Sequence, residues 1–331
     1  MQQKVPLRRR ILTIVSSPRF FWAIVLLLAF QASWIALSAR YPMAFDEDFH
    51  FGVIRIYAHH LSPFLSGQPP GADAYGAVAH DPSYLYHYLM SFPYRLISLF
   101  TDNQTAQVIA LRFVNIALMC SGLMVYRRLL LKVGASRAIT NFSLLIFVLL
   151  PVVPLLAGQI NYDNLLLPVT GLALLAAVEF VDELEDYKRI NTKLLITTLI
   201  LCMLASLIKY AFLPIFLAIG LYFLFGLKRA FPTFRKLLVS LGFGFSLTTR
   251  SMRWFLIVAF IVSSGLFIQR YGVNVVRYHT PVPDCSKVLS VKECSAYGPW
   301  IRDYNFKINK VDEEHSPFVF TADWLYGMWL R

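Results

Sequence analysis

Residues 20–37 read FFWAIVLLLAFQASWIAL, an almost purely apolar run that follows a basic N-terminal segment, residues 1–19. A helix needs about 20 such residues to cross the hydrocarbon core of a bilayer. The run therefore predicts a spanning helix that starts in the cytoplasm and emerges on the outer face at about Arg40. A cleaved signal peptide is the alternative, with a cleavage site at 36–39. We favour a retained anchor, because the residues just after the run carry chemistry.

The composition of the whole chain points to the same class. Of the 331 residues, 57% are hydrophobic and 15% are charged, and the mean hydropathy is +0.56. A soluble globular protein carries roughly 25% charged residues, so this chain could not cover a soluble surface. These values exclude a soluble enzyme, a secreted disulfide scaffold and a disordered chain. An integral membrane protein with several spanning helices remains.

Further apolar runs and the basic residues between them predict a topology. Basic residues gather in alternate connections, so placing every basic loop in the cytoplasm gives one arrangement: N-terminus inside, seven spans, C-terminal segment outside. The net charge of +12 is then explained by cationic loops and needs no nucleic-acid partner. The runs after the first are 104–126, 138–157, 164–181, 194–208, 211–227 and 254–271.

The expected fold is an all-α polytopic membrane protein with about seven transmembrane helices. Within the long outer loop, residues 83–100 are aromatic and moderately apolar and predict a helix lying in the membrane interface. Residues 237–249 are too short to span and predict a cytoplasmic re-entrant or surface helix. The aromatic tail 321–331 predicts an interfacial helix or the approach to further spans. The domains are a cytoplasmic N-terminus, 1–19, a transmembrane domain, 20–272, containing the outer loop 39–103, and an extracytoplasmic segment, 273–331.

The four cysteines divide by position. Cys285 and Cys294 lie in the outer segment, where an oxidising environment favours a short disulfide loop, and two free thiols are the alternative. Cys120 and Cys202 fall inside predicted spans, where we expect them simply to be packed.

Residues 45–52, FDEDFHFG, place three consecutive acids, Asp46, Glu47 and Asp48, close to the end of the first span. Charges near the hydrocarbon region are costly and tend to be functional. On a helix, Asp46 and His50 would share a face. A carboxylate there could accept a proton or hold a cation. The alternative is a solvated helix start, because acids favour the first turn.

This stretch carries a family resemblance. Asp-Glu-x-x-His-Phe after the first span resembles the signature loop of the GT-C glycosyltransferases, which include the protein O-mannosyltransferases and the lipid A aminoarabinose transferases. It is also similar to a large uncharacterised bacterial membrane family of that clan. The mannosyltransferase motif is Asp-Glu-x-His-Phe-Gly, so the histidine here comes one residue later if counted from Asp46. Counting from Glu47 restores the spacing and reverses the acids, which leaves the working acid open.

Other segments extend the resemblance over most of residues 20–225. Residues 80–86, HDPSYLY, resemble the second conserved segment of the family's first loop. Residues 158–164, GQINYDN, resemble its short outer turn with an acid. Residues 206–214, SLIKYAFLP, resemble its outer turn with a basic residue. The family commonly has more spans than the runs found in this chain.

The resemblance implies an enzyme, a hexosyl- or pentosyltransferase that moves a sugar from a polyprenyl-phosphate donor to an acceptor on the extracytoplasmic face of the bacterial cytoplasmic membrane. An attacking hydroxyl or amine must lose a proton, which requires a base. The resemblance assigns this role to Asp46, with Glu47 as the alternative. The departing phosphate needs positive charge, assigned to Lys209, unless that lysine only snorkels to the interface. The topology adds further substrate-binding candidates: Asp48, His50, His80, Asp81, Tyr84 and Asp163.

The sequence assigns no metal site and no firm cofactor. The loop histidines lack the spacing of a zinc site, whereas a divalent cation held by Asp46, Glu47 or Asp48 stays open. The expected partners are the lipid-linked sugar donor and membrane lipids. A transporter or flippase of a lipid-linked or anionic substrate is the rival function, because prolines interrupt several predicted spans. A non-catalytic relative that assembles with a partner is the third.

Overall fold

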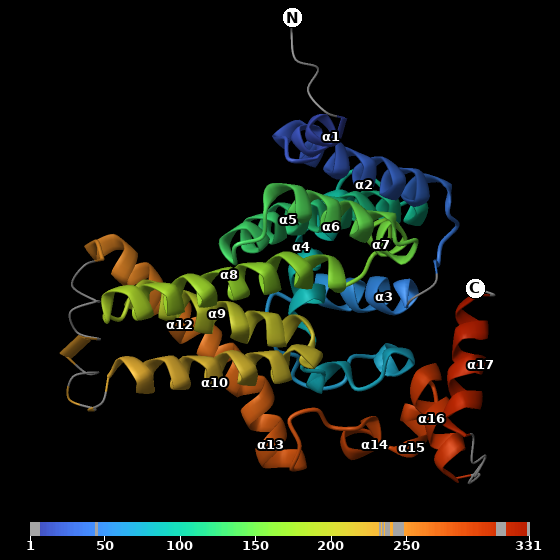
Figure 1. The fold of residues 1–331 in the computed structure, drawn as a ribbon. Helices are drawn as coiled ribbons and strands as arrows, with labels where there is room; N and C mark the ends of the chain where they lie inside the picture. Colours follow the sequence, from blue (N-terminus) through green and yellow to red (C-terminus); the bar gives the residue numbers. More distant parts are fainter. Residues whose placement is uncertain are drawn as a thin grey trace, which may run out of the picture.

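A computed structural model describes residues 7–43, 46–231, 233, 235, 239–240, 248–308 and 316–329. Within these ranges the chain is mostly helical and contains no strand (Figure 1). Five helical segments are long and apolar enough to cross a membrane, which indicates a membrane-embedded protein. They are α2 (Pro18–Ser38), α5 (Gln104–Lys132), α8 (Asp163–Tyr187), η3 with α10 (Tyr210–Phe212 and Leu213–Ala230), and α12, η4 and α13 (Arg250–Phe267, Ile268–Gly272 and Val273–Tyr278).

The two remaining apolar runs form shorter helices. The run 138–157 breaks into α6 (Arg137–Leu149) and α7 (Val152–Ala157). A residue that precedes a proline is pushed out of the helical region, and Leu150, before Pro151, is extended at φ −67° and ψ 121°. The run 194–208 becomes α9 (Thr192–Ile208), which has 17 residues. Spanning length is therefore shown for five of the seven predicted segments.

The loop after α2 and the C-terminal segment also fold into helices. The predicted interfacial helix at 83–100 appears as α4, and the surface or re-entrant helix predicted at 237–249 lies mostly outside the described residues. Short elements fill the rest of both regions and the N-terminus. These are α1 (Leu7–Val15), α3 (Glu47–Ala58), η1 (Ala72–Tyr75), η2 (Val78–His80), α4 (Leu85–Ser98), α14 (Cys285–Val288), α15 (Val291–Cys294), α16 (Gly298–Ile308) and α17 (Pro317–Trp329).

The bundle packs α5 against α2 and α8, α8 against α9, and α9 against α12 (Figure 1). Glycines bring α5 and α8 close together: a Cβ on Gly122 would lie 2.6 Å from Leu167 Cδ2. The outward face of α2 stays apolar, with Leu26, Phe30 and Trp34 67%, 70% and 68% exposed. Such a surface would be anomalous in water and is what a lipid-facing helix presents.

Successive helices reverse direction, so their connections gather at two ends of the bundle. At one end Lys132 pairs with Asp182 at 2.9 Å, close to the basic connections that follow α5 and α8. We call this the cationic end. The other end carries loop 39–103 and the turns before α8 and α10; we call it the loop end. Here the Tyr210 N–H donates to Ser83 Oγ at 3.0 Å, so segments far apart in sequence meet.

Candidate functional site

Glu47, the first residue of α3, is fully buried in an ion pair with Arg112 of α5. Arg112 Nε and Nη2 donate to its two oxygens at 2.8 and 2.7 Å. The Ile160 N–H donates to the same carboxylate at 3.2 Å. Arg112 Nη1 also donates to the carbonyls of Ala36 and Ala39, both at 2.9 Å. This group fastens the start of the loop to α2, α5 and the turn before α8.

The three consecutive acids thus have three different environments. Glu47 is saturated with donors and holds structure, so its geometry disfavours the alternative role of base. Asp48 Oδ1 accepts the Tyr41 hydroxyl at 2.5 Å. Asp46 is exposed, and its carboxylate makes no hydrogen bond to any described residue. Its φ of 63° is a left-handed conformation, which aspartate adopts more readily than most residues. Among the three acids, Asp46 is the one with neither oxygen hydrogen-bonded to a described residue.

Several predicted site residues meet around Tyr162, which the sequence did not single out as a site residue. Lys209 Nζ lies 4.5 Å from the Tyr162 ring centroid and binds Asp163 Oδ1 and Oδ2 at 2.8 and 3.1 Å. Burial raises the pKa of Tyr162, and the charges of Asp163, Asp81 and Asp46 raise it further. Asp163 and Lys209 are therefore in direct contact beside Tyr162 at the loop end, and Asp81 and Asp46 are near enough for their charges to act on Tyr162. The charge of Lys209 is shared with Asp163 rather than free.

His50 takes part in a buried histidine pair. Its Nδ1 lies 2.9 Å from His87 Nε2, and His87 Nδ1 lies 3.2 Å from the Ser83 carbonyl oxygen. Because a carbonyl only accepts, His87 carries its proton on Nδ1 and accepts the His50 Nδ1–H at Nε2. Burial lowers the pKa of His50 well below its usual value and that of His87 to about 3. Both rings are neutral at physiological pH, and His50 Nε2 is left as an acceptor.

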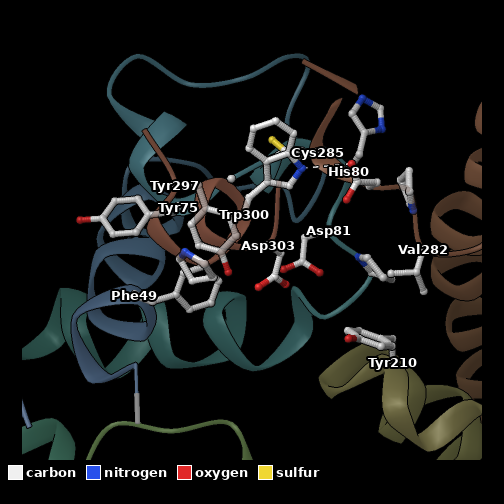
Figure 2. Close-up of a pocket in the computed structure, with 16 residues that line it drawn as sticks. Phe49, Tyr75, His80, Asp81, Tyr210, Val282, Cys285, Tyr297, Trp300 and Asp303 are labelled. Carbon is white, nitrogen blue, oxygen red and sulfur yellow. Dashed lines mark hydrogen bonds between the residues drawn. The ribbon is translucent and has the colours of Figure 1, made fainter. Parts of the chain in front are cut away.

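His80 and Asp81 lie in the wall of a cavity of about 430 Å³ at the loop end (Figure 2). Burial raises the pKa of Asp81, and its Oδ1 accepts the Ser83 N–H at 2.8 Å. Burial lowers the pKa of His80, and the nearby positive charges of Arg270 and Arg277 lower it further. Both groups are therefore shifted toward their neutral forms.

Tyr84, predicted to bind substrate, does not line this cavity. It is 1% exposed, and the Arg270 guanidinium lies 4.5 Å from its ring centroid. Arg270 donates from Nη1 to the Ala79 carbonyl. The side chain of Tyr84 is therefore a packed part of the core, away from this cavity.

Half of the cavity comes from the C-terminal segment, which the sequence did not assign to the site. Cys285 and Cys294 form a disulfide there, with an S–S distance of 2.07 Å. Trp300 Nε1 donates to Asp284 Oδ2 at 3.0 Å. Burial alone would raise the pKa of Asp284, but hydrogen bonds from Ser286 and Trp300 outweigh it and lower the pKa. The mixture of acids and aromatic residues around the cysteine pair was the available signal.

Arg112 and His87 were also missed. An arginine within the apolar run 104–126 signals a buried partner, because an isolated charge there is too costly. His87 carried a weaker signal, a histidine inside an apolar helical stretch. Among the described residues, no group of three or more His, Cys, Asp or Glu is placed to hold a metal ion. Glu47 and Asp48 turn to different partners, so the acidic triplet does not converge on a cation.

Comparisons of the chain with protein families, with curated proteins and with solved structures found no match.

Proposed function

We propose that the protein is a membrane glycosyltransferase that takes a sugar from a polyprenyl-phosphate donor and transfers it to an acceptor at the loop end. The observation that carries this proposal is the Lys209–Asp163 pair against the Tyr162 ring, together with the exposed carboxylate of Asp46, which is near enough for its charge to raise the pKa of Tyr162. We place the loop end outside the cytoplasm of a bacterial inner membrane and the cationic end inside, as the distribution of basic loops favours.

In this proposal Asp46 accepts the proton that the acceptor hydroxyl or amine loses as it attacks the anomeric carbon. The bond from the anomeric carbon to the phosphate oxygen breaks, and Lys209 stabilises the negative charge on the departing phosphate. A cavity of about 500 Å³ lies between the loop ends of α2 and α5, and polar and basic side chains, Arg112 among them, line it together with apolar ones. Its walls include Leu37, Val108 and Ile109, with Arg40 also lining it.

The test is transfer from a radiolabelled polyprenyl-phosphate sugar by the purified full chain in liposomes. Because a general base contributes about 10²- to 10⁴-fold, we expect Asp46→Asn to lose activity by that factor. We expect Lys209→Met to raise the apparent KM for the donor. The matched control is Asp102→Asn, the same change at an exposed loop-end acid, which should leave transfer unchanged. Full activity of Asp46→Asn would overturn the assignment.

A transporter or flippase is the second candidate, favoured by interruptions in two helical segments. One is the break between α6 and α7, and the other is the π-helical turn η4 (Ile268–Gly272) in the last candidate span. Transporters bind substrates at such discontinuous helices. Movement of labelled lipid-linked sugar across the liposome bilayer, without any transfer product, would support this candidate and reject the transferase.

A further inference from the structure

Five aromatic rings and three carboxylates line the cavity in Figure 2, together with prolines and small residues. No lysine or arginine is among its lining residues, and its one histidine, His80, has a lowered pKa and adds no positive charge at neutral pH. The carboxylates give the space negative charge, which Arg270 near Asp81 and Lys307 near Asp284 offset in part, and the raised pKa of Asp81 reduces its share. The rings are Phe49, Tyr75, Tyr210, Tyr297 and Trp300, and the carboxylates are Asp81, Asp284 and Asp303.

Each carboxylate keeps one oxygen available. Within the described residues, Asp81 Oδ2, Asp284 Oδ1 and Asp303 Oδ2 accept no hydrogen bond. The only ion pair among them, Arg302 Nε to Asp303 Oδ1 at 3.2 Å, is about two-thirds exposed on both sides and neutralises little. The other oxygen of each carboxylate accepts hydrogen bonds. Asp81 Oδ1 accepts the Ser83 N–H, and Asp303 Oδ1 accepts the Arg302 Nε–H. Asp284 Oδ2 accepts the Ser286 N–H and hydroxyl and the Trp300 Nε1–H.

The rings are held in place by close packing. A Cβ on Gly52 would lie 2.1 Å from Tyr75 Cζ, so only glycine leaves room for that ring. Gly76, at φ +73°, would bring a Cβ to 3.0 Å from Tyr297 Cδ1. The Phe49 ring stands edge-on to Tyr75, with centroids 6.2 Å apart. A cage built this way does not need to be ordered when a ligand enters, which favours binding.

We infer that this cavity binds an organic ammonium cation. Aromatic faces attract cations through the ring quadrupole, and cages of such rings are suited to ammonium groups. The carboxylates add direct attraction, whereas a phosphate or carboxylate ligand would be repelled. The cavity is therefore unsuited to the donor phosphate, which the proposed function assigns to Lys209. The inference goes beyond sugar transfer, because the ammonium ligand is neither donor nor acceptor in that reaction. A binding measurement tests it without any assay of transfer.

The test uses the purified full chain in detergent micelles and two probes of the same shape, choline and its uncharged isostere 3,3-dimethylbutan-1-ol. Calorimetric titration should show choline binding at least about tenfold more tightly than the alcohol, since charge is the main difference between them. The choline affinity should also fall as salt is added, because screening weakens the attraction. Equal affinities for the two probes would overturn the inference.

Two variants assign the binding to this cavity. Asp303→Asn and Asp81→Asn should each weaken choline binding about three- to tenfold, while the exposed control Asp102→Asn should bind as the unmodified chain does. Asp303 lies on the exposed side of α16, so its variant keeps the fold, which its thermal melting would verify. Wild-type affinity in both variants would reject the site. Sugar transfer without choline binding would reject this inference alone, and choline binding without transfer would reject only the transferase.

Discussion

At the scale of single residues, partners decide the roles of chemically similar side chains. Asp46, Glu47 and Asp48 are neighbours in sequence, yet the first accepts no hydrogen bond from the described residues, the second is sealed against a guanidinium and the third accepts a tyrosine hydroxyl. A buried carboxylate persists only when paired, because desolvation of a lone charge is too costly. Arg112 therefore determines that Glu47 is structural, and the proposed function accordingly assigns proton transfer to Asp46.

Arg112→Met should destabilise the folded protein by about 3–5 kcal/mol, because it leaves the Glu47 carboxylate buried without a partner. The comparison is Lys132→Met, which breaks the partly exposed Lys132–Asp182 pair and should cost about 0–1 kcal/mol. Denaturant unfolding in micelles measures both. The double variant Arg112→Met with Glu47→Leu should recover much of the loss. Equal effects of the two single variants would contradict a buried ion pair.

The histidine pair predicts a stability that depends on pH. Folding lowers the pKa of both His50 and His87, that of His87 to about 3. In the unfolded chain a histidine has a pKa of about 6.5, so below that pH the unfolded chain binds more protons than the folded one. Stability is complete above that pH and should fall as the pH drops, by about 1.4 kcal/mol per pH unit for each histidine.

Melting temperatures between pH 7.5 and 5 would measure this slope. His87→Gln should reduce the slope, because it removes one of the two groups that resist protonation. His59→Gln changes an exposed histidine and should leave the slope as it is. A stability that is flat over this range would show that the pair is protonated in the folded protein.

At the scale of elements, close backbone contacts set how the helices meet. The turn after α7 packs directly on α2: a Cβ on Gly158 would lie 2.8 Å from the Ala32 carbonyl oxygen. A backbone oxygen cannot move aside as a flexible side chain can. This contact positions the turn that carries Tyr162 and Asp163, so the site depends on the approach of α7 to α2.

Gly158→Ala should destabilise the protein by about 1–3 kcal/mol, because the added methyl group must push two backbones apart. Gly220→Ala in α10 is the matched control, since a Cβ there meets nothing within 4 Å. That variant should be neutral or slightly stabilising, by up to about 1 kcal/mol, through helix propensity. Thermal unfolding of both proteins in one detergent gives the comparison. Similar melting temperatures for the two variants would contradict the close packing.

At the scale of the whole molecule, the chain separates its charges into two ends. The acids of the candidate site and the cavity lie at the loop end, and the basic connections after α5 and α8 lie at the other. Basic loops prefer the cytoplasm, so this separation is the basis for placing the cationic end inside and the loop end outside in the proposed topology.

Single cysteines test this orientation in a chain whose own free cysteines, Cys120 and Cys202, are replaced by alanine. His59→Cys at the loop end should react with a membrane-impermeant thiol reagent in intact cells. Lys193→Cys at the start of α9 should react only after permeabilisation. Both positions are exposed, so access depends on the membrane alone. The opposite pattern would invert the proposed topology and remove the extracytoplasmic site.

The sequence by itself determined that this is a helical membrane protein and where its apolar helices lie, because hydropathy and proline are local signals. Even the break at Pro151 was readable in the run 138–157, although that run was interpreted as one span. Tertiary structure decided the rest. Glu47 and Arg112 are 65 residues apart, and Asp81 shares its cavity with Trp300 from the far end of the chain. Which acid is free, which histidines are neutral and which rings form the cavity depend on burial and partners, and those arise only when distant segments pack.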